Sequence, residues 1–485
     1  MILLESGGLD YEASISDLNA GENCGLDYYD LEDSRLRFFG GTTAIWGGRC
    51  AELDPIDLER RDYVPHSGWP LEWGELQRWY DEARPLFGLP LRRPAAEEFR
   101  RAGLPLPKFD PAELETPLWT FDARFNRFTF DSCGDLEAHP RCEILTHATV
   151  TRITGSGGGR IESVEARSLR GAKLTVRAKT FVLAAGGIEN PRLLLASHIG
   201  NEHDQVGRYF MEHPHARGGR IVDGAAWKLL KVFARRHRIG GQDMAALITP
   251  SEALQRREGV LNTSLTIVGR QPQGRRQSIG MKAYAEIKHS LAPTKSGRAL
   301  WMLTKKAAGW AQRHIDPARP WLLHNLGSLD VALLVRAEQA PNPESRVLLS
   351  EKTDETGVPR VKLDWRLSEI DVRSVGVLVE ALGRELARLG LGKVEPAEWL
   401  SSGLWQTDPL ISAHSIGGYH HMGTTRMGSD PRSSVADADG RVHGVGNLFI
   451  AGSSLFPTGS WANPTLTIVA LALRTAERIS RELKA

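Results

Sequence analysis

The chain has 485 residues, of which 41% are hydrophobic and 25% are charged, and its formal net charge is +2 at pH 7. This composition is ordinary for a globular protein of about three domain-sized units. A charge so close to neutral gives no general attraction to nucleic acid, and no apolar run of about 18 residues predicts a membrane-spanning helix.

The cysteine spacing argues against a zinc or haem protein, and the first residues argue against a secreted one. None of the four cysteines forms a C-x-x-C pair, so we expect no structural zinc or other metal site and no attached haem. Residues 1–5 contain neither a basic stretch nor a long apolar core. The sequence therefore predicts no signal peptide and favours a cytoplasmic protein.

The first element expected along the chain is a buried strand at residues 1–4, closed by Glu5 and a Ser-Gly-Gly turn. In a dinucleotide-binding βαβ unit the second strand ends in an acid that binds the adenosine ribose, about 20 residues after a glycine-rich loop. Glu5 fits that position, although only four residues precede it. The alternative is that Glu5 is a simple turn residue.

A second motif, Gly-Gly-Thr-Thr-Ala-Ile-Trp-Gly-Gly, occupies residues 40–48. Its paired glycines let the backbone approach a flat ligand closely, and the hydroxyls of Thr42 and Thr43 can bind phosphate or ring heteroatoms. The alternative interpretation is a tight turn that carries Trp46 into the core. Apolar spacing then predicts a helix over residues 71–87.

The rest of the chain predicts two interleaved domains. Period-two patterning indicates a strand meander from residue 142 and a fully buried strand over 180–187, followed by a helix that begins at Pro191. Strands are expected at 345–349 and 361–365, a helix at 369–389 and a further buried strand at 447–452. Strand–glycine–helix units at both ends of the chain indicate one α/β domain into which a second domain is inserted.

The most informative residues lie near the C-terminus. His420 and His421 precede a Met-Gly-Thr-Thr turn, and Asn463 precedes Pro464 at the start of an apolar helix pattern. A helix beginning there offers free N–H groups and a positive dipole end to an anionic ligand. Alternatively, Asn463 is a helix cap alone and His420 is a hydrogen-bonded core residue.

Four motifs in this order give the chain a resemblance to a known family. They are Leu-Leu-Glu-Ser-Gly-Gly, Gly-Gly-Thr-Thr-x-x-Trp-Gly-Gly, His-His-Met-Gly-Thr-Thr-Arg-Met-Gly and Ala-Gly-Ser-Ser followed by Asn-Pro-Thr-Leu-Thr. Together they resemble the glucose–methanol–choline (GMC) oxidoreductases, most of all the sugar dehydrogenase and pyranose oxidase branch. The match runs from residue 1 to about 479 and is weakest between 216 and 340.

The resemblance implies an α/β (α+β) fold with a Rossmann-like FAD-binding domain built from residues 1–60, 135–215 and 405–485. It further implies a connecting or lid region at 61–134 and a substrate-binding domain with an antiparallel sheet at 216–404. By the same resemblance the first strand of the FAD-binding domain and its glycine loop are missing. We therefore expect weak or absent FAD binding by these 485 residues alone.

The resemblance also implies the oxidation of an alcohol, of a sugar, polyol or glycoside, by hydride transfer to flavin N5. His420 falls at the general-base position and Asn463 at its partner position, while spacing leaves His421 open as the base. Ile45 stands where some relatives attach flavin covalently to a histidine, so we expect non-covalent FAD. The cofactor-binding residues implied are Glu5, Gly41, Thr42, Thr43, Trp46, Gly47, Val150, Ala185, Gly452, Ser453, Asn463 and Thr465.

Three rival interpretations remain at this point: a non-redox FAD-containing lyase on the same scaffold, an inactive truncated product, and a nicotinamide-dependent enzyme, which fits less well. The electron acceptor is open among oxygen, a quinone and a cytochrome. The basic segment 295–314 is expected to be a solvated helix with its tryptophans turned to the core, and contact with a membrane surface or a partner is the less favoured alternative.

Overall fold

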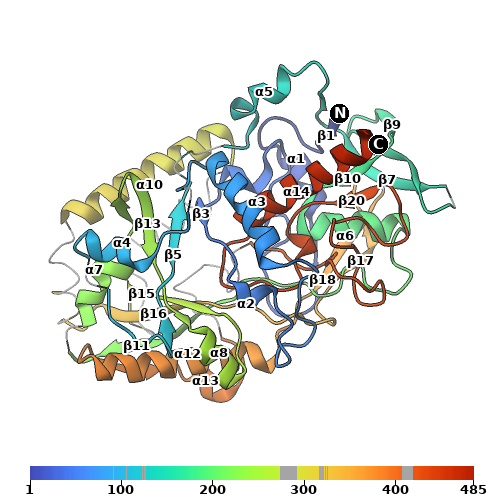
Figure 1. The fold of residues 1–485 in the computed structure, drawn as a ribbon. Helices are drawn as coiled ribbons and strands as arrows, with labels where there is room; N and C mark the ends of the chain where they lie inside the picture. Colours follow the sequence, from blue (N-terminus) through green and yellow to red (C-terminus); the bar gives the residue numbers. More distant parts are fainter. Residues whose placement is uncertain are drawn as a thin grey trace.

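Figure 1 shows a molecule of two lobes, with both chain ends close together in one lobe and an antiparallel sheet in the other. The computed structural model describes residues 1–485 except 91, 105, 123, 125, 126, 157, 225, 273–291, 316–321, 323, 325, 407–418 and 485. Helices and strands alternate in both lobes, so the fold is of the mixed α/β class expected from the sequence.

Two parallel strand pairs form the centre of the lobe that holds the chain ends. Strand β1 (Ile2–Leu4) pairs with β6 (Glu143–Leu145), and β10 (Phe181–Leu183) pairs with β20 (Leu448–Ile450). The predicted burial is confirmed for β20, but the burial predicted for β1 and the full burial predicted for β10 are wrong, since Ile2 and Val182 are 47% and 48% exposed. Among the described residues each of these two strands is paired on one side alone, which leaves the other edge open.

Helices and a meander cover these pairs. The meander consists of β7 (Thr149–Gly155), β8 (Ile161–Arg167) and β9 (Lys173–Arg177). Helix α14 (Thr465–Lys484) turns Leu466, Ala470 and Leu471 inward at helical spacing and packs against α3 (Trp73–Leu86), where Tyr80 Oη lies 2.8 Å from Thr467 Oγ1. The helices predicted near residues 71–87 and after Asn463 are therefore confirmed.

Helix α6 (Gly186–Ser197) corrects one predicted boundary. We expected a helix beginning at Pro191, but the helix begins five residues earlier and contains that proline. Proline has no N–H to donate to the carbonyl four residues before it, here Gly187. The hydroxyl of Thr424 donates to the Gly187 oxygen at 2.6 Å instead, so a side chain from another segment replaces the missing helix bond.

The second lobe is built on a four-stranded antiparallel sheet of order β15-β16-β11-β19. Its strands are β15 (Ser264–Arg270), β16 (Asp330–Arg336), β11 (His215–Val222) and β19 (Lys393–Pro396). Helix α12 (Glu369–Arg388) begins at a capping box of Ser368 and Asp371 and packs its apolar face on this sheet. The antiparallel sheet and the helix at 369–389 are confirmed.

Smaller sheets join the lobes. One contains β12 (His237–Ile239), β13 (Gln242–Ala246), β5 (Leu118–Phe121) and β3 (Arg49–Cys50), in that order. Another contains β17 (Arg346–Thr353), β18 (Pro359–Asp364) and β2 (Gly21–Asn23), with the predicted β17–β18 hairpin. The remaining elements are β4 (Leu114–Glu115), β14 (Thr249–Pro250), α1 (Ala13–Ser16), α2 (Pro55–Leu58), α4 (Ala96–Arg101), α5 (Gly134–Glu137), α7 (Leu230–Phe233), α8 (Glu252–Glu258), α10 (Lys295–Ile315) and α13 (Trp399–Ser402).

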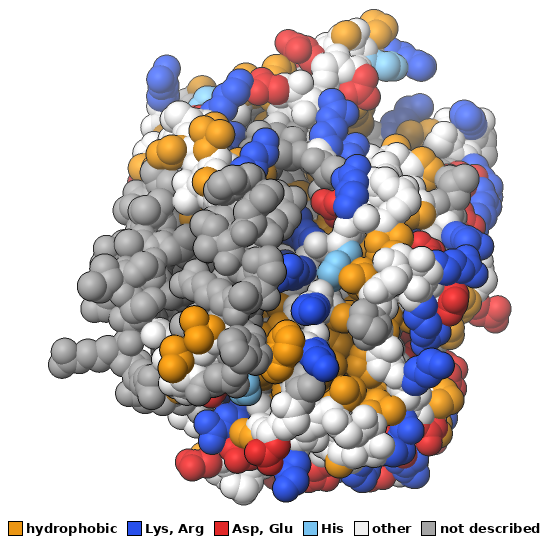
Figure 2. Space-filling view, turned by 90° about the vertical axis from the view of Figure 1, so that its left-hand side faces the viewer, with side chains coloured by type: hydrophobic (Ala, Val, Ile, Leu, Met, Phe, Trp, Pro, Cys, Tyr) orange, Lys and Arg blue, Asp and Glu red, His pale blue; other side chains and the backbone are white. Residues whose placement is uncertain are grey.

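Several basic side chains run down the middle of the face shown in Figure 2. In the part of the chain that the structure describes, no helix combines the length and apolarity needed to span a bilayer. Helix α10 forms as predicted and buries Arg298 against Asp10 and the ring of Phe38. Its contact with a membrane or partner stays a prediction, and the side chain of Trp310 lies outside the described residues.

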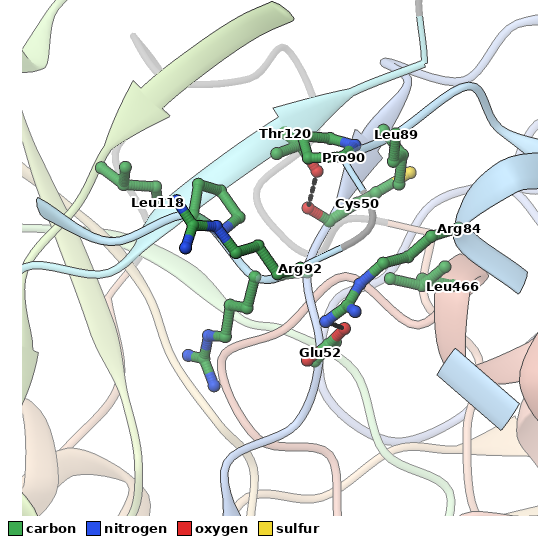
Figure 3. Close-up of a pocket in the computed structure, with 12 residues that line it drawn as sticks. Cys50, Glu52, Arg84, Leu89, Pro90, Arg92, Leu118, Thr120 and Leu466 are labelled. Carbon is green, nitrogen blue, oxygen red and sulfur yellow. Dashed lines mark hydrogen bonds and ion pairs between the residues drawn. The ribbon is translucent and has the colours of Figure 1, made fainter. Parts of the chain in front are cut away.

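Two of the cavities among the described residues have well-defined linings. The smaller one, of about 20 Å³, is enclosed by β3, β5, α3 and Leu466, and Figure 3 shows the ion pair of Arg84 with Glu52 at its wall. That volume holds about one water molecule. The larger one, of about 580 Å³, opens between residues 60–70 and 426–433, and neither His420 nor Asn463 lines it.

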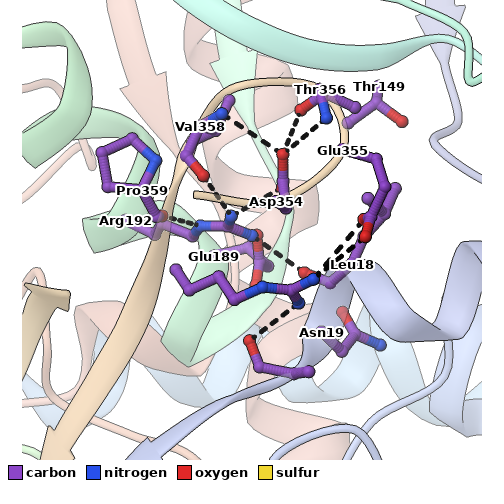
Figure 4. A network of polar contacts seen from close by, with 12 residues as sticks. Leu18, Asn19, Thr149, Glu189, Arg192, Asp354, Glu355, Thr356, Val358 and Pro359 are labelled. Carbon is purple, nitrogen blue, oxygen red and sulfur yellow. Dashed lines mark hydrogen bonds and ion pairs between the residues drawn. The ribbon is translucent and has the colours of Figure 1, made fainter. Parts of the chain in front are cut away.

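A buried charge network fastens three segments together (Figure 4). Glu189 of α6 pairs with Arg35, Arg37 and Arg192 at 2.8, 3.0 and 3.2 Å. Arg192 also pairs with Asp354 in the β17–β18 turn at 2.7 Å. These three arginines hold the pKa of the Glu189 carboxyl far below its usual range despite its burial. The network thus joins the N-terminal segment, α6 and the hairpin.

Candidate active site

His420 and Asn463, 43 residues apart in the sequence, meet in the structure. The Asn463 amide nitrogen lies 3.2 Å from His420 Nε2, immediately before helix α14. On the other side of the ring, His420 Nδ1 lies 2.7 Å from Nδ1 of His213. His213 in turn places its Nε2 2.7 Å from the backbone oxygen of Ser460 and 3.3 Å from that of Gly459.

This chain of contacts fixes which ring nitrogens carry protons. Backbone oxygens accept hydrogen bonds but cannot donate them, so His213 Nε2 must carry its proton. A neutral His213 then has an unprotonated Nδ1, which requires His420 Nδ1 to be the donor. Nε2 of His420 is consequently left with its lone pair, and Asn463 donates to it. That nitrogen carries no proton, so it can take one from a bound group that replaces the Asn463 contact.

The surroundings keep these imidazoles neutral. Burial lowers the pKa of His420 well below its ordinary value, and His213, His215, His421 and Arg49 add to the effect. Burial also lowers the pKa of His213, although its contacts to the Ser460 and Gly459 oxygens oppose the shift. A neutral imidazole is the form that acts as a base.

A second cluster fixes the backbone of His420. Both carboxylate oxygens of Glu212 accept from the His420 N–H, at 3.1 and 3.0 Å. The Tyr28 hydroxyl donates to Glu212 and accepts from His421 Nε2 at 2.9 Å. His421 therefore faces Tyr28 and Glu212, while His420 faces His213 and Asn463. The alternative left open by sequence spacing is unfavourable, because His421 Nε2 carries the proton that Tyr28 accepts, whereas His420 Nε2 carries none.

The neutral histidines predict acid sensitivity of folding. Burial lowers the pKa of His421 to about 3, so the unfolded chain binds a proton near pH 6.5 that the folded chain refuses. The contribution of His421 to the free energy of unfolding is fully present above pH 6.5. It falls by about 1.4 kcal/mol per pH unit as the pH is lowered toward 3. His421→Gln keeps a donor for Tyr28 but cannot titrate. In urea unfolding, we expect its deficit against the native chain to shrink steadily from pH 7 to pH 4; a deficit independent of pH would contradict this.

Residues predicted to bind the adenosine end of a cofactor also come together. Glu5 follows β1, and its backbone oxygen accepts from the N–H of Ala148 at 2.9 Å, two residues before Val150. Its carboxylate accepts from the N–H of Gly7 at 2.8 Å, and burial raises its pKa. The structure thus places an acid and the start of β7 together at the carboxyl end of the β1–β6 pair. The Glu5 contact to Gly7 is also what the alternative, a turn residue, requires.

The carboxyl ends of β10 and β20 form a backbone-lined cradle. Ala185 leads into Gly186 at φ +88°, and Ala451 leads into Gly452 at φ +117°. A Cβ added to either glycine would meet no atom within 4 Å, so open space lies above both. Next to them, Ser453 donates its hydroxyl to the His421 oxygen at 2.7 Å. Bare backbone at the ends of parallel strands, close to the histidines, fits a flat dinucleotide cofactor.

The threonine loop is ordered by its own contacts. Gly41–Ala44 forms a single 3₁₀ turn in which Thr42 accepts from the N–H of Leu36 at 3.1 Å and Thr43 donates to the Gly40 oxygen. Trp46 packs 5.9 Å from the Phe87 ring, as the core alternative predicts. Gly47 accepts from Arg236. No contact joins this loop directly to His420 among the described residues, so its predicted role toward a cofactor stays a prediction, as does that of Thr465.

Comparison with known proteins agrees with these features. Residues 135–215 and 341–472 match the N-terminal and C-terminal family models described as GMC oxidoreductase. The chain belongs to the GMC oxidoreductase family. Members of this family use FAD, and the protein is an FAD-dependent oxidoreductase that acts on CH–OH groups.

Individual relatives cover nearly the whole chain. Paromamine 6'-oxidase of Streptomyces fradiae is 26% identical over 92% of this chain and 78% of its own length. The large subunit of fructose dehydrogenase of Gluconobacter japonicus is 26% identical over 95% and 83%. Among solved structures, a formate oxidase of Aspergillus oryzae is similar in fold, with a TM-score of 0.56, 16% identity and 100% and 94% of the two chains covered.

Three neighbours of His420 were not predicted as site residues from the sequence. Glu212 and His213 lie in a Met-Glu-His-Pro segment, and Tyr28 lies near the N-terminus. They lie 392, 208 and 207 residues from His420, in the order Tyr28, Glu212, His213. No local spacing rule could relate them, because the β-bridge between Met211 and Met422 is what aligns the two segments.

Proposed function

We propose that this protein oxidises an alcohol group of a sugar, polyol or glycoside, with His420 as the general base. The unprotonated Nε2 of His420, fixed by the His213 tautomer, is the observation that carries the proposal. The names of the relatives, which include a paromamine oxidase and a fructose dehydrogenase, support a sugar or glycoside as the substrate.

Each residue of the proposed site has a separate role. Nε2 of His420 takes the hydroxyl proton of the substrate, and the Asn463 amide holds the alcohol oxygen beside it as negative charge develops. FAD, when bound, supplies the acceptor for the hydride that leaves carbon. Gly186, Gly452 and Ser453 would line its central part, and Glu5 and Val150 its adenosine part. Residues 1–60, 135–215 and 405–485 would form its domain.

The lyase and the inactive product remain testable alternatives. Anaerobic addition of sugars, polyols and simple glycosides to the FAD-loaded protein is expected to bleach the flavin absorbance near 450 nm when one of them is a substrate. A panel of such alcohols that leaves the flavin oxidised, while FAD is bound stoichiometrically, would count against redox function. Comparison of aerobic and quinone-containing reactions then assigns the electron acceptor.

His213 is proposed as a positioning residue. His213→Ala removes the acceptor for His420 Nδ1, so the His420 proton can move to Nε2 and block the base. We expect a fall in the flavin reduction rate of roughly 10- to 100-fold and a displaced pH dependence of that rate. His213→Asn presents an amide oxygen to His420 and should restore part of the rate. Equal rates in the native chain and His213→Ala would remove the tautomer argument.

FAD is expected to be bound without a covalent link, because Ile45 offers no nucleophile to the flavin. Acid precipitation of FAD-loaded protein should leave the yellow colour in the supernatant. A yellow pellet that retains flavin after washing would contradict this.

A further inference from the structure

Two partly buried arginines next to the proposed base lack the carboxylate partners that several other arginines have. Arg49 in β3 and Arg336 in β16 both place their guanidinium carbons 5.2 Å from the centre of the Trp119 ring. In the described part of the chain, no carboxylate lies within ion-pair distance of either guanidinium. The buried Nε of Arg49 has no hydrogen-bond partner, and neither has the buried indole Nε1 of Trp119.

Several other arginines of the molecule are neutralised by carboxylates, although the guanidinium of buried Arg426 contacts the His66 carbonyl and the Tyr209 ring instead. Arg61 pairs with Glu338 at 2.9 Å, and Arg192 pairs with both Glu189 and Asp354. Arg49 and Arg336 also differ from the paired Arg61 and Arg192 in the direction of their pKa shifts. Burial and the neighbouring Arg236 lower the pKa of Arg49 to about 10, and burial with Arg49 and Arg270 lowers the pKa of Arg336 to about 9. Both side chains are partly buried, and an unpaired charge largely removed from solvent is costly, so its presence here points to a ligand rather than a structural role.

The pair lies beside the histidines. Arg336 is the cross-strand partner of His215 in the β11–β16 ladder. His215 stands two residues after His213, which contacts His420. Arg49 comes directly after the threonine-tryptophan loop, and its charge helps to lower the pKa of His420. An anion held by the two guanidinium groups would therefore occupy the same region as the alcohol approaching His420.

We propose that the alcohol oxidised at this site carries a carboxylate, and that Arg49, Arg336 and Trp119 Nε1 bind it. This inference rests on the proposed function and names its substrate class as hydroxylated carboxylates such as uronic acids and their glycosides. The three groups are donors with no acceptor among them, which matches a group that accepts alone. Trp119 lies against both guanidinium groups.

A matched ligand pair tests the proposal. Methyl β-D-glucuronide and methyl β-D-glucoside differ at one carbon, which is a carboxylate in the first and a hydroxymethyl in the second. Calorimetric titration of the anaerobic FAD-loaded protein should show the glucuronide binding at least 10-fold more tightly. Arg336→Met and Arg49→Met should each weaken glucuronide binding by roughly 10- to 100-fold and leave glucoside binding unchanged. Arg238→Met, which changes an exposed arginine paired with Asp243, is the control.

Stability gives an independent measurement. Removing an unpaired buried charge should hold or raise the unfolding midpoint of Arg336→Met, whereas Arg61→Met, which leaves Glu338 without its partner, should lower it. Equal affinity for the two glycosides, or a lowered midpoint in Arg336→Met with unchanged glucuronide affinity, would overturn the proposal. Weakened binding of ADP with unchanged binding of glucuronide would assign the arginines to a cofactor phosphate instead and would also overturn it.

Flavin bleaching separates this inference from the proposed function. Bleaching by neutral glycosides together with equal affinity for the two ligands leaves the function intact and removes the carboxylate. Arginine-dependent binding of glucuronide without bleaching by any alcohol supports the anion site and removes the oxidation.

Discussion

His420→Ala is expected to slow flavin reduction by an alcohol substrate by roughly 10²- to 10⁴-fold, the range typical of a general base. The Nε2 lone pair, held by the His213 tautomer, is lost, and the Asn463 amide has no acceptor in its place. Stopped-flow absorbance under anaerobic conditions measures the effect directly. FAD content should not change, because neither Glu5 nor the glycines of the cradle contact this side chain.

Controls make the result specific. His421→Gln alters the neighbouring histidine while keeping a donor for Tyr28, so it should reduce the flavin at close to the native rate. Added imidazole should restore part of the rate in His420→Ala, because a small free base can enter the vacated space. Native rates in His420→Ala, or a larger loss in His421→Gln, would transfer the base role to another group.

Arg192→Met is expected to lower the free energy of unfolding by about 3–5 kcal/mol, the range for breaking one partner from a buried charge pair. Its guanidinium contacts Glu189, Asp354 and the carbonyls of Leu18, Val358 and Pro359 (Figure 4). Glu189 retains Arg35 and Arg37, but Asp354 loses its ion-pair partner in a buried site. Urea unfolding followed by fluorescence and circular dichroism measures the change.

An exposed arginine provides the matched control. Arg78 pairs with Glu82 and Glu477 at the surface, with 57% of its side chain exposed, so Arg78→Met should cost no more than about 1 kcal/mol. A loss in Arg192→Met as small as that would show that the network in Figure 4 contributes little to folding. Asp354→Asn in the Arg192→Met background should recover part of the loss, since it removes the unpaired carboxylate.

Much of the fold could be predicted because it is encoded by local patterns. Apolar spacing located α3, α12 and α14, and alternation located the β17–β18 hairpin. The predicted burial of β1 and β10 was wrong for a reason outside any local pattern. An apolar run resembles a strand paired on both sides, but exposure depends on how many neighbours the sheet supplies, and each of these strands has one in the described chain.

Some residues of the candidate site could also be predicted from the sequence, and others could not. The pairing of His420 with Asn463 came from the order of motifs and the family resemblance, and the structure brings the two side chains together. His213 could not be assigned, because its importance lies in one ring nitrogen facing the Ser460 carbonyl. Arg49 and Arg336 carry no sequence signal either. An arginine is ordinary in a sequence, and it becomes informative when its surroundings hold no acid.

The contact of His213 with two backbone carbonyls also limits where a captured proton can travel. If His420 passed the charge inward through Nδ1, His213 would carry it on a ring whose remaining N–H points at oxygens that take up no proton at neutral pH. The His420–His213 pair therefore cannot pass a proton further into the protein. Each turnover must thus release its proton from Nε2, on the side of His420 that faces the substrate and Asn463.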